Sequence, residues 1–575
     1  MRITAPTMQK DIYKEFHQYA YHPEVSRVYA NVVSRSNKYS NTNLNFTVFA
    51  GLQGFIIDYL INEWQVGFFS AKSEDEAVFQ HGRIMSAMLG FKCDTSNLRA
   101  LYQLGYLPLH IKALPEGTFV PYQVSPVTIV NTVDGFQWLT NMIETAFSAD
   151  NWYVQTTATT STAYYLQFLR YARKTGLDES FAMFQGHDFS FRGLAGRGAA
   201  PLAGFGHMVS GFVGTDTIPA VLAAEKFYGA NVDSELVGCS VNATEHSVTC
   251  SWQEEGELAF YRHLMHTVAP TGILSLVFDT WDFWNGVTVI LPELKDEILA
   301  RDGTVVIRPD SGDPVEILCG REFKTVDTYG ATDFDSWKEF VAEDIDDKFR
   351  NELDAEHPHW SDTQLYTGDF GAYKVTYTPS LNRHDKTYYY VDNYGAKVDE
   401  CTFEKVELTA EDKGLIECLW ETFGGTITDK GYKLLNDKIG AIYGDSITLG
   451  RQEQILSRLE KKGFASKVVL GIGSYTYQYV TRDTHGSAIK ATDVVKNGKH
   501  VAIAKEPKTD TSKKSAKGLL RIERVDGKLV QYDQQTPEQE QQGLLETVFL
   551  DGKLVRRTTL QEIRNLVHSQ LEQYI

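Results

Sequence analysis

The stretch VVIRPDSGDP at residues 305–314 decides how the rest of the chain is interpreted. Its first three residues are apolar and β-branched, which is typical of a buried strand, and a Pro/Gly turn follows at once. Arg308 and Asp310 lie where that strand would end. We therefore expect a cation and an anion, two residues apart, to face the same opening.

The same plan recurs along the chain. Short apolar runs lead into aspartate or glycine at 211–216, 274–279, 441–445 and 468–473, and helical patterns lie between several of them, as at 219–228, 256–267 and 449–462. Alternating strands and amphipathic helices predict a parallel α/β sheet. In a closed parallel barrel, the polar strand ends converge on one mouth. We predict an irregular (β/α) barrel, with an open doubly wound sheet as the alternative.

Length and composition limit the function. With 575 residues the chain is too long for one ordinary core, and 42% hydrophobic with 23% charged residues is typical of a globular protein. It has no run of eighteen apolar residues and no apolar signal core at its N-terminus, so we expect a soluble, cytoplasmic protein without membrane contact. The formal net charge of −19 argues against nucleic-acid binding. Six scattered cysteines argue against a disulfide framework or a zinc knuckle.

Three regions are predicted. Residues 1–155 form the N-terminal part of an α+β domain, and residues 484–575 form its C-terminal part. The barrel spans 156–483. An acidic, tyrosine-rich stretch at about 320–430 interrupts it, and because so long a structureless loop is implausible in a compact domain, we predict a β-rich insertion there.

Three segments could do chemistry. Residues 186–193, GHDFSFRG, offer a flat aromatic platform beside a guanidinium, or else a buried ring beside a structural ion pair. His246 follows a glutamate, a pair that is more often structural than catalytic. The GIGS run at 471–474 ends a strand and opens a helix, where free backbone N–H groups bind anions. Together with the nearby aspartates and the lysine-rich loop at 505–517, these segments suit a phosphorylated sugar. The carboxylates would bind the sugar hydroxyls or Mg²⁺. The lysine loop taken alone is more often a solvated loop than a phosphate site.

Taken together, these segments resemble the nicotinamide phosphoribosyltransferases, a type II phosphoribosyltransferase family. The similarity covers nearly the whole chain outside about 320–430. It rests on ordered matches at residues 11–14, 111–117, 138–141, 187–193, 214–217, 245–247, 307–312, 431–435 and 481–483. Departures include Ser190 and Phe191 in the aromatic motif, and Ser474 and Tyr475 where the family's phosphate loop has glycines.

The resemblance implies roles for individual residues. Phe189 and the Tyr13 of a second subunit would sandwich a pyridine ring, whose carboxamide would meet Asp216 and Arg308. His246, supported by Asp279, would accept a phosphoryl group from ATP. The remaining substrate contacts would be Arg192, Ser240, Val241 and Ser275, with Asp310, Gly444 and Asp445 at the ribose. The phosphate contacts would be Arg35, Gly473, Ser474, Arg482, Lys490, Lys505 and Lys513.

The resemblance also implies a reaction. Phosphoribosyl transfer from 5-phosphoribosyl 1-pyrophosphate (PRPP) to nicotinamide would give nicotinamide mononucleotide and pyrophosphate, stimulated by ATP. Mg²⁺ would arrive with PRPP or ATP, with no direct protein ligand, and the active sites would lie at the interface of a homodimer. The alternatives are a nicotinate phosphoribosyltransferase and a non-catalytic nucleotide-binding protein. A second carboxylate beside Asp216 would be repelled, so we expect nicotinamide over nicotinate.

Overall fold

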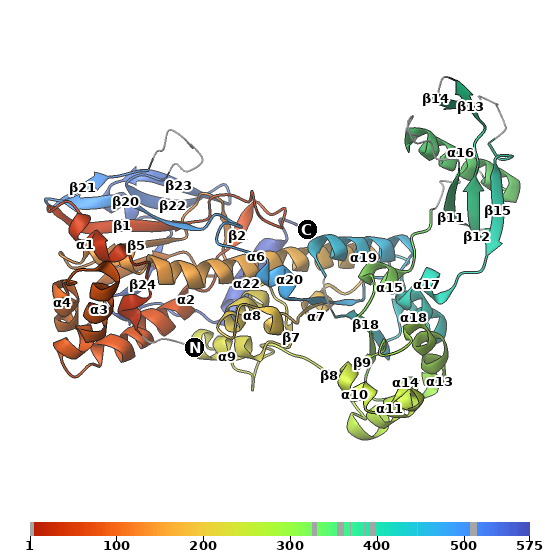
Figure 1. The fold of residues 1–575 in the computed structure, drawn as a ribbon, viewed down its shortest axis with the longest axis horizontal. Helices are drawn as coiled ribbons and strands as arrows, with labels where there is room; N and C mark the ends of the chain where they lie inside the picture. Colours follow the sequence, from red (N-terminus) through yellow and green to blue (C-terminus); the bar gives the residue numbers. More distant parts are fainter. Residues whose placement is uncertain are drawn as a thin grey trace.

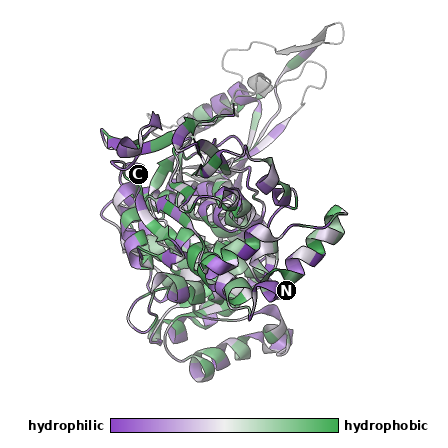
Figure 2. Ribbon diagram, turned by 90° about the vertical axis from the view of Figure 1, so that its left-hand side faces the viewer, coloured by the Kyte–Doolittle hydropathy of each residue, from purple (hydrophilic) through white to green (hydrophobic). Residues whose placement is uncertain are grey.

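The computed structural model describes residues 5–324, 331–352, 361–368, 370–384, 387–390, 397–444, 447–505 and 515–575. Figure 1 shows an elongated molecule with a mixed domain at one end, a barrel region at the other and an arm projecting from the barrel. In Figure 2, hydrophilic and hydrophobic residues alternate along many of the helices, as expected for helices with one buried face. No helix among the described residues is long and apolar enough to cross a membrane.

One sheet is wholly parallel and carries the stretch at 305–314. Its seven strands run in the order β7 (Gly214–Thr215), β6 (Gly186–Asp188), β19 (Val469–Ile472), β18 (Ile439–Tyr443), β10 (Val305–Arg308), β9 (Leu274–Val277) and β8 (Asn242–Ala243). Val305 and Ile307 are fully buried at the centre of this sheet, as β-branched residues prefer.

The two edges of the parallel sheet meet. Cys239, three residues before β8, bridges Gly214 of β7. The N–H of Thr215 donates to the Cys239 carbonyl at 2.9 Å, and the N–H of Cys239 donates to the Val213 carbonyl at 2.7 Å. The sheet therefore curls back on itself, which confirms the barrel-like prediction over the open doubly wound sheet.

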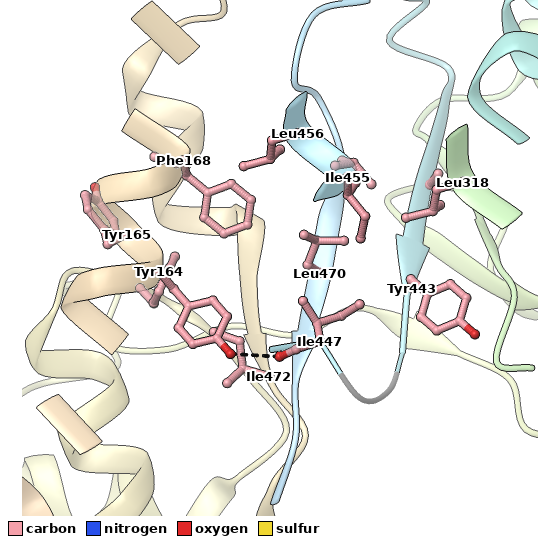
Figure 3. Close-up of a cluster of buried hydrophobic side chains, with 14 of the residues drawn as sticks. Tyr164, Tyr165, Phe168, Leu318, Tyr443, Ile447, Ile455, Leu456, Leu470 and Ile472 are labelled. Carbon is pink, nitrogen blue, oxygen red and sulfur yellow. Dashed lines mark hydrogen bonds between the residues drawn. The ribbon is translucent and has the colours of Figure 1, made fainter. Parts of the chain in front are cut away.

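Amphipathic helices cover the barrel, and α19 (Leu449–Lys461) illustrates why they form. The Thr448 side chain caps its first turn by accepting from the N–H of Arg451. Its buried residues Ile455, Leu456 and Leu459 recur at helical spacing. In Figure 3, Ile455 and Leu456 point toward Leu470 of β19.

The long helix α6 (Glu144–Thr175) packs against α19 and connects the two main cores. Its first turns bury Ala146 and Phe147 in the core of the mixed domain, and its later turns bury Tyr164 and Phe168 in the barrel core. The predicted division at 155/156 thus falls inside one continuous helix of 32 residues.

Tyr164 ties α6 to the loop that follows β18. Its buried hydroxyl donates to the Ile447 carbonyl at 2.8 Å, the contact drawn in Figure 3. We expect Tyr164→Phe to lower the free energy of unfolding by about 1 kcal/mol, because the Ile447 carbonyl loses one buried donor and keeps the Thr476 hydroxyl at 3.3 Å. Thermal or urea unfolding measures the change. Tyr165→Phe is the matched control, since the Tyr165 hydroxyl has no hydrogen bond to a described residue; equal losses in both variants would contradict the assignment.

The second sheet is antiparallel and joins the two ends of the chain. Its order is β21 (Lys499–Ala502), β20 (Ala488–Lys496), β1 (Val25–Val33), β5 (Val127–Asn131), β3 (Leu109–Ala113), β24 (Glu546–Leu550) and β25 (Lys553–Leu554). The three strands from before residue 132 lie together in the middle, with two strands from after residue 487 on each side. This confirms an α+β domain built from the N- and C-terminal regions. The last helix, α22 (Leu560–Leu571), instead packs in the barrel core.

The arm in Figure 1 is the insertion, and it has its own hydrophobic core. Helix α16 (Phe334–Glu352) packs on the sheet of β11 (Asp362–Gly368), β12 (Gly371–Tyr377) and β15 (Cys401–Val406). The insertion is therefore mixed α and β, whereas the sequence was interpreted as β-rich with little helical period. Helix α18 (Leu415–Phe423), inside the predicted span of 320–430, belongs to the barrel core.

Candidate active site

The carboxyl ends of the parallel strands carry the polar residues to one rim of the barrel. A residue of interest follows each strand within a few positions: Phe189 after β6, Asp216 after β7, His246 after β8, Asp279 after β9, Asp310 after β10, Gly444 after β18 and Gly473 after β19.

Asp216 is the half-exposed carboxylate of this rim. Its Oδ1 lies 2.9 Å from Nε2 of His187 and accepts from the Ser240 hydroxyl at 2.6 Å. Burial raises the pKa of Asp216. The hydrogen bonds from His187 and Ser240, together with the charges of His187 and Arg308, lower this pKa by more, so the net shift is downward. Asp216 is therefore an ionised acceptor at neutral pH.

Phe189 packs against His187, the imidazole that contacts this carboxylate. Its N–H donates to the Ile472 carbonyl at 3.0 Å, and its ring centroid lies 4.5 Å from that of His187. A Cβ on Gly471 would lie 2.7 Å from the Phe189 ring and 2.6 Å from the Gly444 carbonyl oxygen. Glycine at 471 thus allows the ring to lie flat against β19, where a larger residue would displace it.

Arg308 reaches the same space from β10. Its Nη2 donates to the Thr244 carbonyl at 2.7 Å, while its buried Nε has no hydrogen-bond partner. The Ser275 hydroxyl on the neighbouring strand β9 is also buried and unpartnered. Because buried polar atoms are normally paired, two unpaired ones at a rim indicate a place for a polar ligand.

His246, Asp279 and Asp310 form a second group at the rim. The His246 Nε2 lies 3.9 Å from Asp279 Oδ1 and 3.8 Å from Asp310 Oδ2, while its Nδ1 lies 3.1 Å from the Thr280 hydroxyl. Asp279 Oδ2 accepts from the N–H of Asp310 at 2.9 Å and from the Ser311 hydroxyl at 2.6 Å. The His246 side chain is 45% exposed, which leaves it open to a substrate. Asp279 supports it at long range rather than by a hydrogen bond.

Four cations gather near the start of β20. Burial lowers the pKa of Lys490, and the charges of Arg35, Lys505 and Arg482 lower it further, against the opposing charge of Glu144. Arg35 is fixed because its Nε donates to the Gly486 carbonyl at 2.8 Å. Mutually repelling cations with one partly buried member are typical of a site that receives phosphates.

The other predicted site residues are placed as follows. Ser474, the first residue of α20 (Ser474–Gln478), packs against Gly193, so that a Cβ there would lie 2.0 Å from its hydroxyl. Arg192 and Val241 are exposed. Tyr13 is 58% exposed in the mixed domain, and its ring contacts His17 and Lys14 among the described residues, not the barrel rim. Asp445 and Lys513 lie outside the described residues.

One buried group could hold a metal, and it lies away from the rim. Ligand atoms of Glu15, His81 and Cys93 lie within 4.8 Å of one another. Lys10 Nζ, however, lies 2.5 Å from Glu15 Oε2, and the Cys93 thiol donates to Glu15 Oε1 at 3.3 Å. Burial and the Glu15 charge raise the pKa of Cys93 to about 12. The cluster is thus balanced by lysine and a protonated thiol.

Two residues were not assigned from the sequence. His187 is two positions before Phe189 on the same face of β6, so strand alternation was the signal that could have placed it at the rim. Thr280, which holds Nδ1 of His246, directly follows Asp279, and no pattern in the sequence distinguishes it.

The chain is similar to known proteins over nearly its whole length. The profile of the nicotinate phosphoribosyltransferase (NAPRTase) family matches residues 184–354 and 393–553. A nicotinamide phosphoribosyltransferase of Acinetobacter baylyi is 41% identical, over 98% of this chain and 97% of its own length. The protein of that name from Mycoplasma pneumoniae is 31% identical, over 73% of this chain and 72% of its own. A solved nicotinate-nucleotide pyrophosphorylase from Pyrococcus furiosus has 12% identity and a TM-score of 0.48, covering 100% of this chain and 97% of its own. The chain therefore belongs to the nicotinate phosphoribosyltransferase family.

Proposed function

We propose that this enzyme transfers the phosphoribosyl group of PRPP to nicotinamide, giving nicotinamide mononucleotide and pyrophosphate in NAD salvage. The observation that carries the proposal is the ionised Asp216 beside the Phe189 ring. An anionic acceptor suits the N–H₂ of a carboxamide and repels a carboxylate. The relatives named nicotinamide phosphoribosyltransferase support the same substrate.

The pyridine ring would stack on Phe189, with its amide between Asp216 and Arg308. Asp216 accepts the amide N–H, and the Arg308 guanidinium donates to the amide oxygen. The unpartnered Nε of Arg308 and the unpartnered Ser275 hydroxyl leave donors for this group. A ring held in this way presents its nitrogen to the sugar without an activating base, because that nitrogen already carries a lone pair.

In the transfer step, the ring nitrogen forms a bond to C1 of the ribose while the bond from C1 to the pyrophosphate oxygen breaks. The electron pair leaves with pyrophosphate, and positive charge develops on the sugar. Asp310 stabilises that positive charge, and the cations Arg35, Arg482, Lys490 and Lys505 stabilise the leaving group. The carboxylates of Asp279 and Asp310 suit Mg²⁺. An Mg²⁺ ion that arrives bound to the phosphates of PRPP would neutralise part of their negative charge.

A pyrophosphate-release assay tests this function. With PRPP present, we expect release that depends on nicotinamide and is far weaker with nicotinate. Release with nicotinate alone would assign the nicotinate phosphoribosyltransferase reaction instead. Absence of release with either ring would assign a nucleotide-binding protein without turnover.

We also propose that ATP phosphorylates His246 at Nε2. Thr280 occupies Nδ1, which leaves Nε2 directed toward Asp279 and Asp310. The γ-phosphoryl group would pass to this nitrogen and ADP would leave. The new phosphoryl group would lie beside Asp279 and Asp310, where its oxygens would add ligands for the Mg²⁺ that PRPP or pyrophosphate carries.

His246→Ala should abolish stimulation by ATP and leave basal transfer measurable, because the ring and sugar contacts remain. Initial rates with and without ATP give the result. His266→Ala is the control, since His266 is exposed and pairs with Glu297 at 2.7 Å away from the rim. Stimulation that persists in His246→Ala would remove this histidine from the role of phosphoryl acceptor.

A homodimer is part of the proposal. Among the described residues, the exposed Tyr13 makes ring contacts with His17 and Lys14 and none with the barrel, and a second subunit would bring its Tyr13 onto the free face of Phe189. Exposed Phe16 and Tyr19 on the following helix α1 (Lys14–Ala20) supply apolar area for such an interface. We place the enzyme in the cytoplasm, where its six free cysteines stay reduced.

A further inference from the structure

We propose that Tyr122 and His485 are a pair of positioning residues, which hold the loop of residues 481–487 in the shape that binds the pyrophosphate of PRPP. Neither side chain would touch the phosphates. Both act through the cations that this loop carries or fixes. The inference rests on the proposed function, because it names residues that prepare the phosphate site of that reaction.

Arg35 depends on this loop for its place. Its N–H donates to the His485 carbonyl at 3.0 Å, and its Nε donates to the Gly486 carbonyl at 2.8 Å. Its Nη2 lies 3.9 Å from Asp483 Oδ1, and the Nη2 of Arg482, from the loop itself, lies 3.9 Å from the same oxygen. A displaced loop would therefore move two of the four cations at once.

The imidazole of His485 fixes the loop in turn. His485 is 2% exposed, and its Nδ1 lies 2.9 Å from the Tyr122 hydroxyl. The Nε2 of His485 is buried and has no hydrogen-bond partner among the described residues. The bond to Tyr122 is thus the one hydrogen bond that this imidazole makes within the described part of the chain.

The two groups are in the protonation states that this bond needs. Burial lowers the pKa of His485 to about 4 and raises the pKa of Tyr122 to about 12. At neutral pH the imidazole is uncharged and the hydroxyl keeps its proton, so the hydroxyl can donate to Nδ1. Because the imidazole is uncharged, it adds no repulsion to the cations beside it.

Tyr122 can act as an anchor because its own turn is bound to the end of β1. The turn follows β4 (Phe119–Pro121), and the N–H of Gln123 donates to the Ser34 carbonyl at 2.8 Å. Ser34 directly precedes Arg35. The turn therefore contacts the chain next to Arg35 through its backbone, and it contacts the loop through the Tyr122 hydroxyl.

An anchored loop matters because the cations near the start of β20 repel one another. Burial lowers the pKa of Lys490, and the charges of the other three cations lower it further. Without the anchor, part of the binding free energy of PRPP would go into ordering the loop. That loss affects binding and not the later transfer step, so it should raise KM for PRPP and leave kcat nearly unchanged.

Tyr122→Phe tests the pair, since it removes the hydroxyl and keeps the ring. We expect KM for PRPP, and the dissociation constant of pyrophosphate measured by calorimetry, to rise about fivefold to tenfold, as the loss of one hydrogen bond would produce. KM for nicotinamide should stay unchanged. Tyr102→Phe is the matched control, because the Tyr102 hydroxyl on α4 (Ser96–Leu104) donates to the Ala71 carbonyl at 2.7 Å and does not contact the loop. This control should keep both constants.

Variants at position 485 separate the hydrogen bond from packing. His485→Asn places an amide oxygen near the position of Nδ1, so it should still accept from Tyr122 and keep the constants of the wild type. His485→Leu has no acceptor and should match Tyr122→Phe. Combining His485→Leu with Tyr122→Phe should add no further loss, because both substitutions remove the same bond.

The outcomes that overturn the inference are distinct from those that overturn the proposed function. A pyrophosphate dissociation constant in Tyr122→Phe within about twofold of wild type overturns the inference, as does an equal loss in Tyr102→Phe. If His485→Leu does not fold, Tyr122→Phe and His485→Asn decide. Wild-type protein that binds pyrophosphate but turns over neither ring would overturn the proposed function, and the binding comparison would still decide the inference. Failure of the wild type to bind pyrophosphate would overturn both.

Discussion

Asp216→Ser should reduce the ratio of kcat/KM for nicotinamide over nicotinate by up to about a thousandfold. Two like charges about 4 Å apart at an effective dielectric of about 20 repel by about 4 kcal/mol, and this cost disappears with the carboxylate. Serine still accepts a hydrogen bond from the carboxamide. The ratio should therefore change mainly through a gain with nicotinate, with a smaller loss for nicotinamide. Steady-state kinetics with both rings give the measurement.

Asp483→Ser provides the matched control for this substitution. Asp483 lies 3.9 Å from both Arg35 and Arg482, among the cations proposed for phosphates. Its loss should change the kinetics of PRPP equally with either ring, because both reactions use the same phosphates. An unchanged ratio in Asp216→Ser, or an equal change of the ratio in Asp483→Ser, would refute the placement of the carboxamide at Asp216.

The parallel barrel could be predicted because its strands are short, apolar and followed by polar residues. VVI at 305–307 is the clearest case, and the structure makes it β10, an interior strand of the parallel sheet. The backbone contact that closes the barrel could not be predicted. It depends on Cys239 meeting Gly214, and a single backbone bridge between distant residues leaves no pattern in the sequence.

Helix α16 of the insertion was missed although its signal is present. Trp337, Val341, Ile345 and Phe349 recur every four residues and form one buried face. The acidic residues between them lower the mean hydropathy of the segment, so its composition hides a period that is helical. The sequence also places helix α18 in the insertion, because no local pattern shows that Leu415 and Leu419 pack in the barrel core.

In the site, too, the residues that follow a local sequence pattern could be predicted, and those brought in by tertiary contacts could not. Asp216, Arg308 and Asp310 could be identified because each ends a recognisable strand. Their partners could not, because His187 meets Asp216 from 29 positions away. The long distance from Asp279 to His246 is likewise a matter of packing. Asp279 Oδ2 accepts from the Asp310 N–H and the Ser311 hydroxyl, while Oδ1, 3.9 Å from His246 Nε2, is buried without a hydrogen-bond partner among the described residues.

Asp310→Asn should lower kcat/KM by about a hundredfold to a thousandfold, the range measured when one preorganised electrostatic group is removed from an active site. The substitution keeps the shape of the side chain, which packs so closely that a Cβ on Gly444 would lie 2.7 Å from Asp310 Oδ1. It removes only the charge that would face the developing cation on the ribose. The loss should therefore fall mainly on kcat, because the positive charge exists in the transition state and not in bound PRPP.

Asp313→Asn, three positions along the same turn, is the control for Asp310→Asn. It shows whether activity depends on the carboxylate at the ribose or on any negative charge in this turn. Asp313 caps α15 (Pro314–Cys319) by accepting from the N–H groups of Val315 and Glu316 at 2.9 and 3.1 Å. Asparagine caps a helix about as well, so this variant should keep both its melting temperature and its kcat. Comparable losses in the two variants would mean that the turn responds to any loss of negative charge. Activity of Asp310→Asn within about threefold of wild type would contradict the role of this carboxylate in stabilising the ribosyl cation.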